Sequence, residues 1–103
     1  MGVVCYVYLA TAQAGRSWRV AIKARRVFDD QPTGEAWASN EVEKIRRESQ
    51  AALAQGRNMH LATGGKFIVP TVNDVGIERT RALLLKQVRQ ELPPVPTLPA
   101  RLA

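Results

Sequence analysis

Residues 17–28 read SWRVAIKARRVF, and the alternation along this stretch decides the fold. Its apolar positions recur with a period of two, and arginine or lysine takes most of the positions between them. Such a period is typical of a half-buried β-strand, here with a basic outer face. Residues 3–10, VVCYVYLA, form a second apolar run shortly before it. The two runs predict a β-hairpin.

The register of this hairpin follows from the length of its loop. A loop with an even number of residues, closed by Gly15, puts the apolar residues of both strands on one face. An odd loop would oppose Leu9 to Arg19 and mix apolar with charged side chains. On the apolar face the expected pairs are Leu9–Val20, Val7–Ile22 and Cys5–Ala24. On the other face, we expect Tyr6 beside Lys23 and Tyr8 beside Ala21.

The middle of the chain predicts a helix and a second hairpin. The helix is expected over residues 35–55, with Thr33 as its N-cap. Residues 59–69 read as two short strands, because Thr63-Gly64-Gly65 has the composition of a tight turn. Pro70 would end the second of these strands.

A second helix is expected to begin between residues 74 and 79, capped by Asn73 or Asp74, and to run to Leu92. Residues 93–103 contain four prolines and read as a tail that favours polyproline II. The expected fold class is therefore α+β, in the order ββαββα. Its simplest form is one antiparallel sheet with both helices on one side, a single domain over residues 1–92 and the Pro-rich tail.

Composition and charge narrow the class of protein. The chain has 103 residues, with 15 lysines and arginines against 9 acids, and a net charge of +6. Basic domains of this size favour polyanions such as nucleic acid, an anionic membrane surface or an acidic protein. The single cysteine excludes an internal disulfide and a cysteine-based zinc site, and it fits a reducing, cytoplasmic setting. No apolar run is long enough to span a membrane, and no cofactor is indicated.

The first hairpin carries the candidate binding surface. On the expected basic face, aromatic rings would stack on bases and cations would meet phosphates, as in several single-strand binders. About five neutralised phosphates would give a log–log salt slope near −4 to −5 on duplex DNA. The alternative is that the two tyrosines pack under a helix or another subunit. The candidate nucleic-acid-binding residues are Arg19, Lys23, Arg25, Tyr6, Tyr8 and Arg16.

Other motifs support weaker hypotheses. In the tail, Pro96, Pro99 and Arg101 resemble the proline-rich ligands of SH3 domains, and they are the candidate partner-binding residues. His60, the only histidine, would be the general base of a nuclease-like enzyme, although an ordinary half-buried histidine explains it as well. Cys5 is expected to be a buried, inert thiol.

The last helix is basic on part of its surface, which either extends an electrostatic track from the hairpin or is simply a solvated face. The leading hypothesis is a small non-enzymatic accessory protein that binds nucleic acid or another acidic surface, without a membrane. The alternative is a protein–protein module that self-associates or joins a larger machine of the phage or plasmid type. It would use the sheet and the Pro-rich tail.

Overall fold

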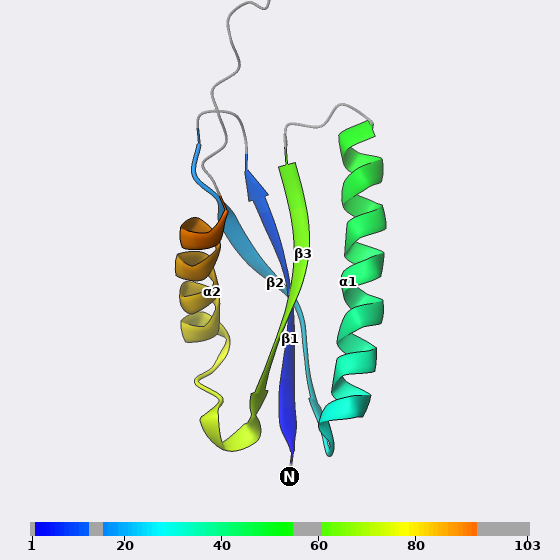
Figure 1. The fold of residues 1–103 in the computed structure, drawn as a ribbon, viewed down its shortest axis with the longest axis vertical. Helices are drawn as coiled ribbons and strands as arrows, with labels where there is room; N and C mark the ends of the chain where they lie inside the picture. The colour runs from blue at the N-terminus through cyan, green and yellow to red at the C-terminus, as the bar shows by residue number, and fades with distance from the viewer. Residues whose placement is uncertain (1, 13–15, 55–60, 93–103) are drawn as a thin grey trace, which may run out of the picture.

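The computed structural model describes residues 2–12, 16–54 and 61–92, which form a three-stranded antiparallel sheet and two helices. The strand order is β2-β1-β3 (Figure 1). The elements follow in the order β1 (Val3–Ala12), β2 (Arg19–Phe28), α1 (Gln31–Ala54), β3 (Leu61–Pro70), the short 3₁₀ turn η1 (Thr71–Asn73) and α2 (Ile77–Glu91). The α+β class is confirmed. The order ββαββα is wrong by one strand.

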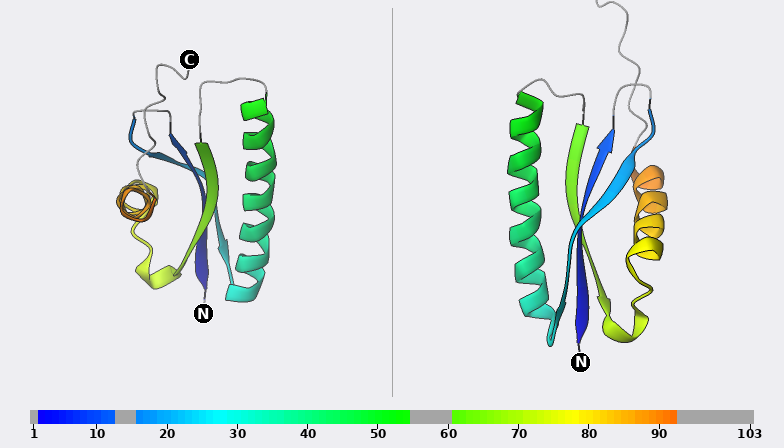
Figure 2. Two further views of the ribbon diagram at one scale, coloured as in Figure 1. Left: turned by 45° about the horizontal axis from the view of Figure 1, so that its top comes forward. Right: turned by 180° about the vertical axis from the view of Figure 1, so that it is seen from behind.

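The two helices lie on opposite faces of the sheet (Figures 1 and 2). One core, between α1 and the sheet, is built on Val3, Cys5, Val7 and Ala38. The other, between α2 and the sheet, is built on Ala10, Ala12, Trp18, Val20, Leu84 and Val88. The expectation of both helices on one side is therefore wrong. Residues 3–7 of β1 are apolar or aromatic at every position, which suits a strand that is covered on both faces.

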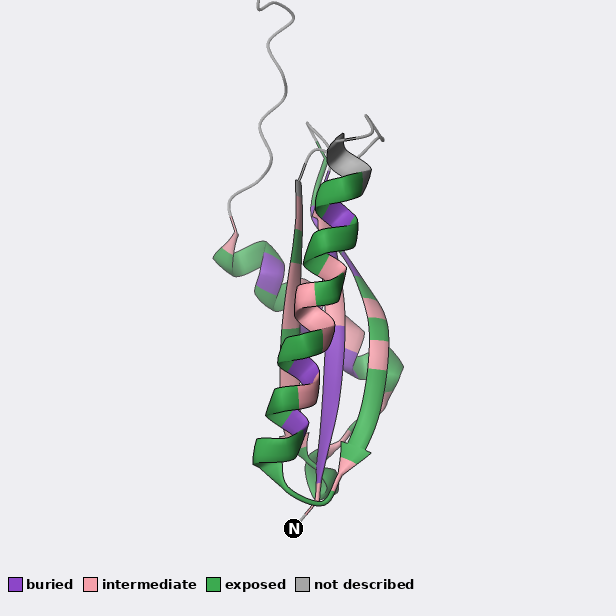
Figure 3. Ribbon diagram, turned by 90° about the vertical axis from the view of Figure 1, so that its right-hand side faces the viewer, coloured by how far each residue is buried: buried purple, intermediate pink, exposed green. Residues whose placement is uncertain are grey.

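Strand β1 is the centre of the molecule. Its residues Val3 to Val7 are all buried, and Figure 3 shows the strand lying behind α1. It pairs with β2 along one edge and with β3 along the other. Burying a large apolar side chain contributes about 1.5–3 kcal/mol. Much of the stability of the fold is therefore concentrated in β1.

The pairing of β1 with β2 shifts by one residue in its middle. Val7 pairs with Ala24 but Tyr8 pairs with Ile22, so that Lys23 has no partner in β1. An extra residue of this kind is a β-bulge. Residues two apart along β2 normally face the same side of the sheet, but across the bulge they face opposite sides. Val20 and Ile22 consequently belong to the α2 face, whereas Ala24 packs on the α1 face. The three predicted apolar pairs are wrong. Thr11 pairs with Arg19, which leaves an odd number of residues between them in place of the predicted even loop. The parity argument also assumed a strand without the bulge, which shifts the register again between Val7 and Tyr8.

The segment predicted as a second hairpin is one strand. Residues 61–70 pair with β1 without interruption, and Gly64 and Gly65 lie opposite Leu9 and Tyr8. A Cβ atom on Gly65 would lie 2.3 Å from Cζ of Tyr8, so the tyrosine ring occupies the space that the glycine leaves open. On the opposite face, Gly64 lies against Val42 of α1. The two glycines allow close approach and do not form a turn.

The helix termini differ from the predicted caps. Helix α1 begins at Gln31, and the carboxylate of Asp30 accepts a hydrogen bond from the Thr33 amide at 2.9 Å. Asp30 is therefore the N-cap in place of Thr33. Helix α2 begins at Ile77, inside the predicted window, but its N-cap is Gly76, with a φ of 92° and no capping side chain. Among the described residues, neither helix is long and apolar enough to cross a membrane.

Candidate anion-binding site

The six candidate nucleic-acid-binding residues do not lie on one surface. Tyr6 is fully buried, at 0% exposure, and Tyr8 is half-buried against the α2 core. The expected pairs on the basic face are both wrong, since Tyr6 lies opposite Arg25 and not Lys23, and Tyr8 lies opposite Ile22 and not Ala21. An open face on which both tyrosines would stack bases therefore does not exist. The four cations are all exposed, but only two of them lie together.

Arg25 belongs to a network with Tyr6 and Asp74, called here the Tyr6 network. The Tyr6 hydroxyl donates to Oδ1 of Asp74, and Nη2 of Arg25 lies 2.7 Å from Oδ2 of the same carboxylate. The Gly76 amide donates to Oδ1 at 3.1 Å. The hydrogen bond from Tyr6, and then that from Arg25, holds the pKa of Asp74 below its usual value. The network holds the segment before α2 against the sheet. It also engages the Arg25 guanidinium in contacts within the protein.

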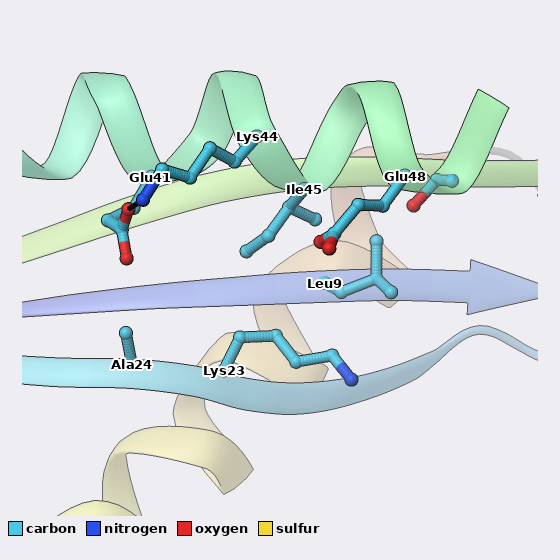
Figure 4. Close-up of a pocket in the computed structure, with 8 residues that line it drawn as sticks. Leu9, Lys23, Ala24, Glu41, Lys44, Ile45 and Glu48 are labelled. Atoms are coloured by element: carbon cyan, nitrogen blue, oxygen red, sulfur yellow. Dashed lines mark ion pairs between the residues drawn. The ribbon is translucent and has the colours of Figure 1, made fainter. Parts of the chain in front are cut away.

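Lys23 lies on the other side of the sheet, in a groove of about 450 Å³ between β2 and α1 (Figure 4). Leu9 and Ile45 contribute apolar surface to this groove. Two lysines and two glutamates also line it, and Lys44 is paired with Glu41 at 2.9 Å. Because these charges balance, the groove offers a polyanion no net attraction.

Arg16 and Arg19 meet a residue from the other end of the chain. Together with Ser17 and Arg89, they line a hollow of about 350 Å³, called here the arginine hollow. Arg19 begins β2 and Arg89 belongs to the last turn of α2, and these two segments lie side by side in Figures 1 and 2. No carboxylate lines the hollow among the residues that the structure describes. None of its three arginines forms an ion pair with another described residue.

Local packing explains why these arginines meet. Trp18 and Val20 are buried against α2, which leaves Arg19 between them exposed. On α2, Val88 is buried in the same core, and its neighbour Arg89 emerges at the sheet margin. Nε of Arg89 donates to the Trp18 carbonyl oxygen at 3.2 Å. This bond fixes the guanidinium and leaves its other N–H groups for a ligand.

Sequence reasoning identified Arg16 and Arg19 but did not join them to Arg89. The sequence did indicate a basic surface on the last helix. The periodicity of a helix shows which of its faces is apolar, but not where that face packs on the sheet. An arginine cluster without acids is a ready site for phosphate or carboxylate, because guanidinium groups bind both in a bidentate manner.

The remaining candidates are Cys5, His60 and the tail residues. Cys5 is buried, as expected, and burial together with the Glu35 carboxylate raises the pKa of its thiol. Within the described part of the chain, no three His, Cys, Asp or Glu side chains gather to hold a metal ion. His60 and the tail residues Pro96, Pro99 and Arg101 lie outside the described residues.

Comparisons with known proteins give no relative from which a function could be transferred. No family model, no curated protein and no solved structure matches the chain.

Proposed function

We propose that the protein is a non-enzymatic nucleic-acid-binding protein that holds backbone phosphates in the arginine hollow. The observation that carries the proposal is the convergence of Arg16, Arg19 and Arg89 on one hollow that no carboxylate of the described residues lines. The three guanidinium groups, which form no ion pair with any residue that the structure describes, repel one another, and an anion between them would relieve that repulsion. The net charge of +6 would draw a polyanion toward the surface from a distance.

Nucleic acid remains the partner, as expected from the sequence, but the residues that would contact it are different. Tyr6 and Arg25 have structural roles in the Tyr6 network and are not assigned to binding. Lys23 and the basic residues of α2 outside the hollow contribute to the general field. With three phosphate contacts in place of five, the expected log–log salt slope falls to about −2.7 on duplex DNA and about −2 on single strands.

A salt titration with fluorescent oligonucleotides tests this proposal. We expect binding at about 50 mM salt, and each of Arg16→Gln, Arg19→Gln and Arg89→Gln should reduce the size of the slope by about 0.7–0.9. Arg47→Gln removes the same charge from α1, where Arg47 lies 3.6 Å from Glu43, and should leave the slope unchanged. Absence of binding at low salt, or equal effects of all four variants, would reject the arginine hollow.

A second candidate is protein–protein contact through apolar residues in the connection from β3 to α2 and at the start of α2. Val72, Val75 and Ile77 are 78%, 48% and 49% exposed, which is unusual for three large apolar side chains within six residues. If this surface mediates self-association, the mass measured by sedimentation should rise with concentration, and Val72→Ser should abolish the rise. A constant monomer mass would dismiss self-association through this surface.

A further inference from the structure

We infer that the arginine hollow and a smaller apolar slot beside it form one site for an unpaired nucleotide, with the phosphate in the hollow and the base in the slot. This inference rests on the proposed function and names the form of nucleic acid that the site would take. The slot, called here the Trp18 slot, has a volume of about 210 Å³. It is lined by Ser17, Trp18, Arg89 and Leu92.

The two cavities share a wall. Ser17 and Arg89 line both of them, so a ligand that fills one lies directly beside the other. One cavity is lined by three cations and a hydroxyl, and the other adds an indole and a leucine side chain. A ligand that matches both has an anionic end joined to a flat or apolar end, which is the composition of a nucleotide.

The sizes of the cavities limit what would fit. Sites for whole small molecules run from about 300 to 1,000 Å³, so the Trp18 slot alone is too small for one and suits a single ring system. Trp18 is only 5% exposed, and its indole therefore offers an edge and not a full stacking face. The remaining contact would come from the half-buried Leu92 and from Arg89, because guanidinium planes also stack on bases.

The slot favours single strands over duplexes. A base in a duplex is stacked and paired, and moving it into a side pocket costs a few kcal/mol. In a single strand, the base is already free to turn toward the protein. Duplex DNA would therefore reach the arginine hollow with its phosphates but leave the Trp18 slot empty.

The test compares three ligands of about eight nucleotides, the lower part of the range for single-strand sites. They are an oligothymidine, a hairpin duplex stable at low salt, and an abasic strand with the same phosphates as the oligothymidine. The protein carries Trp37→Phe, so that Trp18 is the only tryptophan that reports binding. Trp37 packs on Phe28 in the α1 core, away from both cavities. We expect oligothymidine to change Trp18 fluorescence at saturation and to bind about tenfold more tightly than the abasic strand.

Two variants separate the halves of the site. Leu92→Ala should lower the affinity for oligothymidine severalfold and leave the affinities for the abasic strand and the duplex unchanged. Arg19→Gln should weaken all three. Lys86→Gln removes one charge from the same helix outside both cavities and should not distinguish the ligands. If Leu92→Ala fails to fold, the comparison of oligothymidine with the abasic strand still tests the inference.

The outcomes also separate this inference from the proposed function. Equal affinity for oligothymidine and the abasic strand would overturn the nucleotide site while leaving phosphate binding in place. Unchanged Trp18 fluorescence at saturation would do the same. Failure of all three ligands to bind at low salt would reject the proposed function itself.

Discussion

Removing the Asp74 carboxylate should destabilise the fold through a residue in a different element. In Asp74→Ala, the Tyr6 hydroxyl loses its acceptor in a fully buried position, and an unsatisfied buried donor costs about 1–3 kcal/mol. The lost ion pair with Arg25 adds no more than about 1 kcal/mol, because the arginine side chain is 36% exposed. The expected loss is about 1–4 kcal/mol. For a domain of this size, that loss lowers Tm by roughly 4–30 °C.

Urea unfolding of a double-mutant cycle with Tyr6→Phe measures the coupling. Tyr6→Phe alone should cost about 0.5–1.5 kcal/mol, because Asp74 keeps the guanidinium of Arg25 and the Gly76 amide. The Tyr6→Phe variant has no hydroxyl that could lose its acceptor. In that background, Asp74→Ala should therefore lower the free energy of unfolding by about 1 kcal/mol or less. Equal costs in the two backgrounds would refute the idea that a buried, stranded hydroxyl is the main penalty.

The pH dependence of the same variant gives an independent check. Because the pKa of Asp74 is lower in the folded protein than in the unfolded chain, its contribution is complete above the unfolded value of about 3.9. It is lost as the pH falls through the folded value. The stability difference between the wild type and Asp74→Ala should therefore be constant near neutral pH and narrow only below about pH 4. A difference that already narrows at pH 6 would point to another group.

Three further outcomes follow from the packing. Gly65→Ala should destabilise the protein by about 1–3 kcal/mol in urea unfolding, whereas Gly64→Ala, whose added Cβ meets only ordinary contacts from 3.4 Å outward, should be nearly neutral. The Cys5 thiol should react with a thiol reagent only as fast as the protein opens, and a fast native-state reaction would contradict its burial. Asp30→Ala should lower Tm through the lost cap, while Asp29→Ala, which caps nothing, should not.

Local patterns predicted much of the secondary structure. The period of two located β2, the apolar run before it located β1, and the start of α2 lies inside the predicted window. These signals depend on neighbours within a few residues. They failed where contacts between distant segments determine the structure. At the bulge, the extra residue Lys23 places Val20 and Ile22 on the α2 face of the sheet, opposite to Ala24.

Glycine was misinterpreted for a related reason. Gly64 and Gly65 look like a turn in a list of residues, because a sequence does not show which side chain will pack against them. The candidate site was likewise predicted only in part. Arg16 and Arg19 are close in sequence and were predicted together, but Arg89 joins them only through the docking of α2.

The central position of β1 has a consequence for how the chain folds. β1 leaves the ribosome well before β3, with β2 and α1 between them, so one of its edges stays unpaired during that interval. Pairing of strands so distant in the sequence is slow, because a long loop must close before any contact forms. Until then, ten largely apolar residues present an open edge to other copies of the chain. Refolding yield should therefore fall as protein concentration rises.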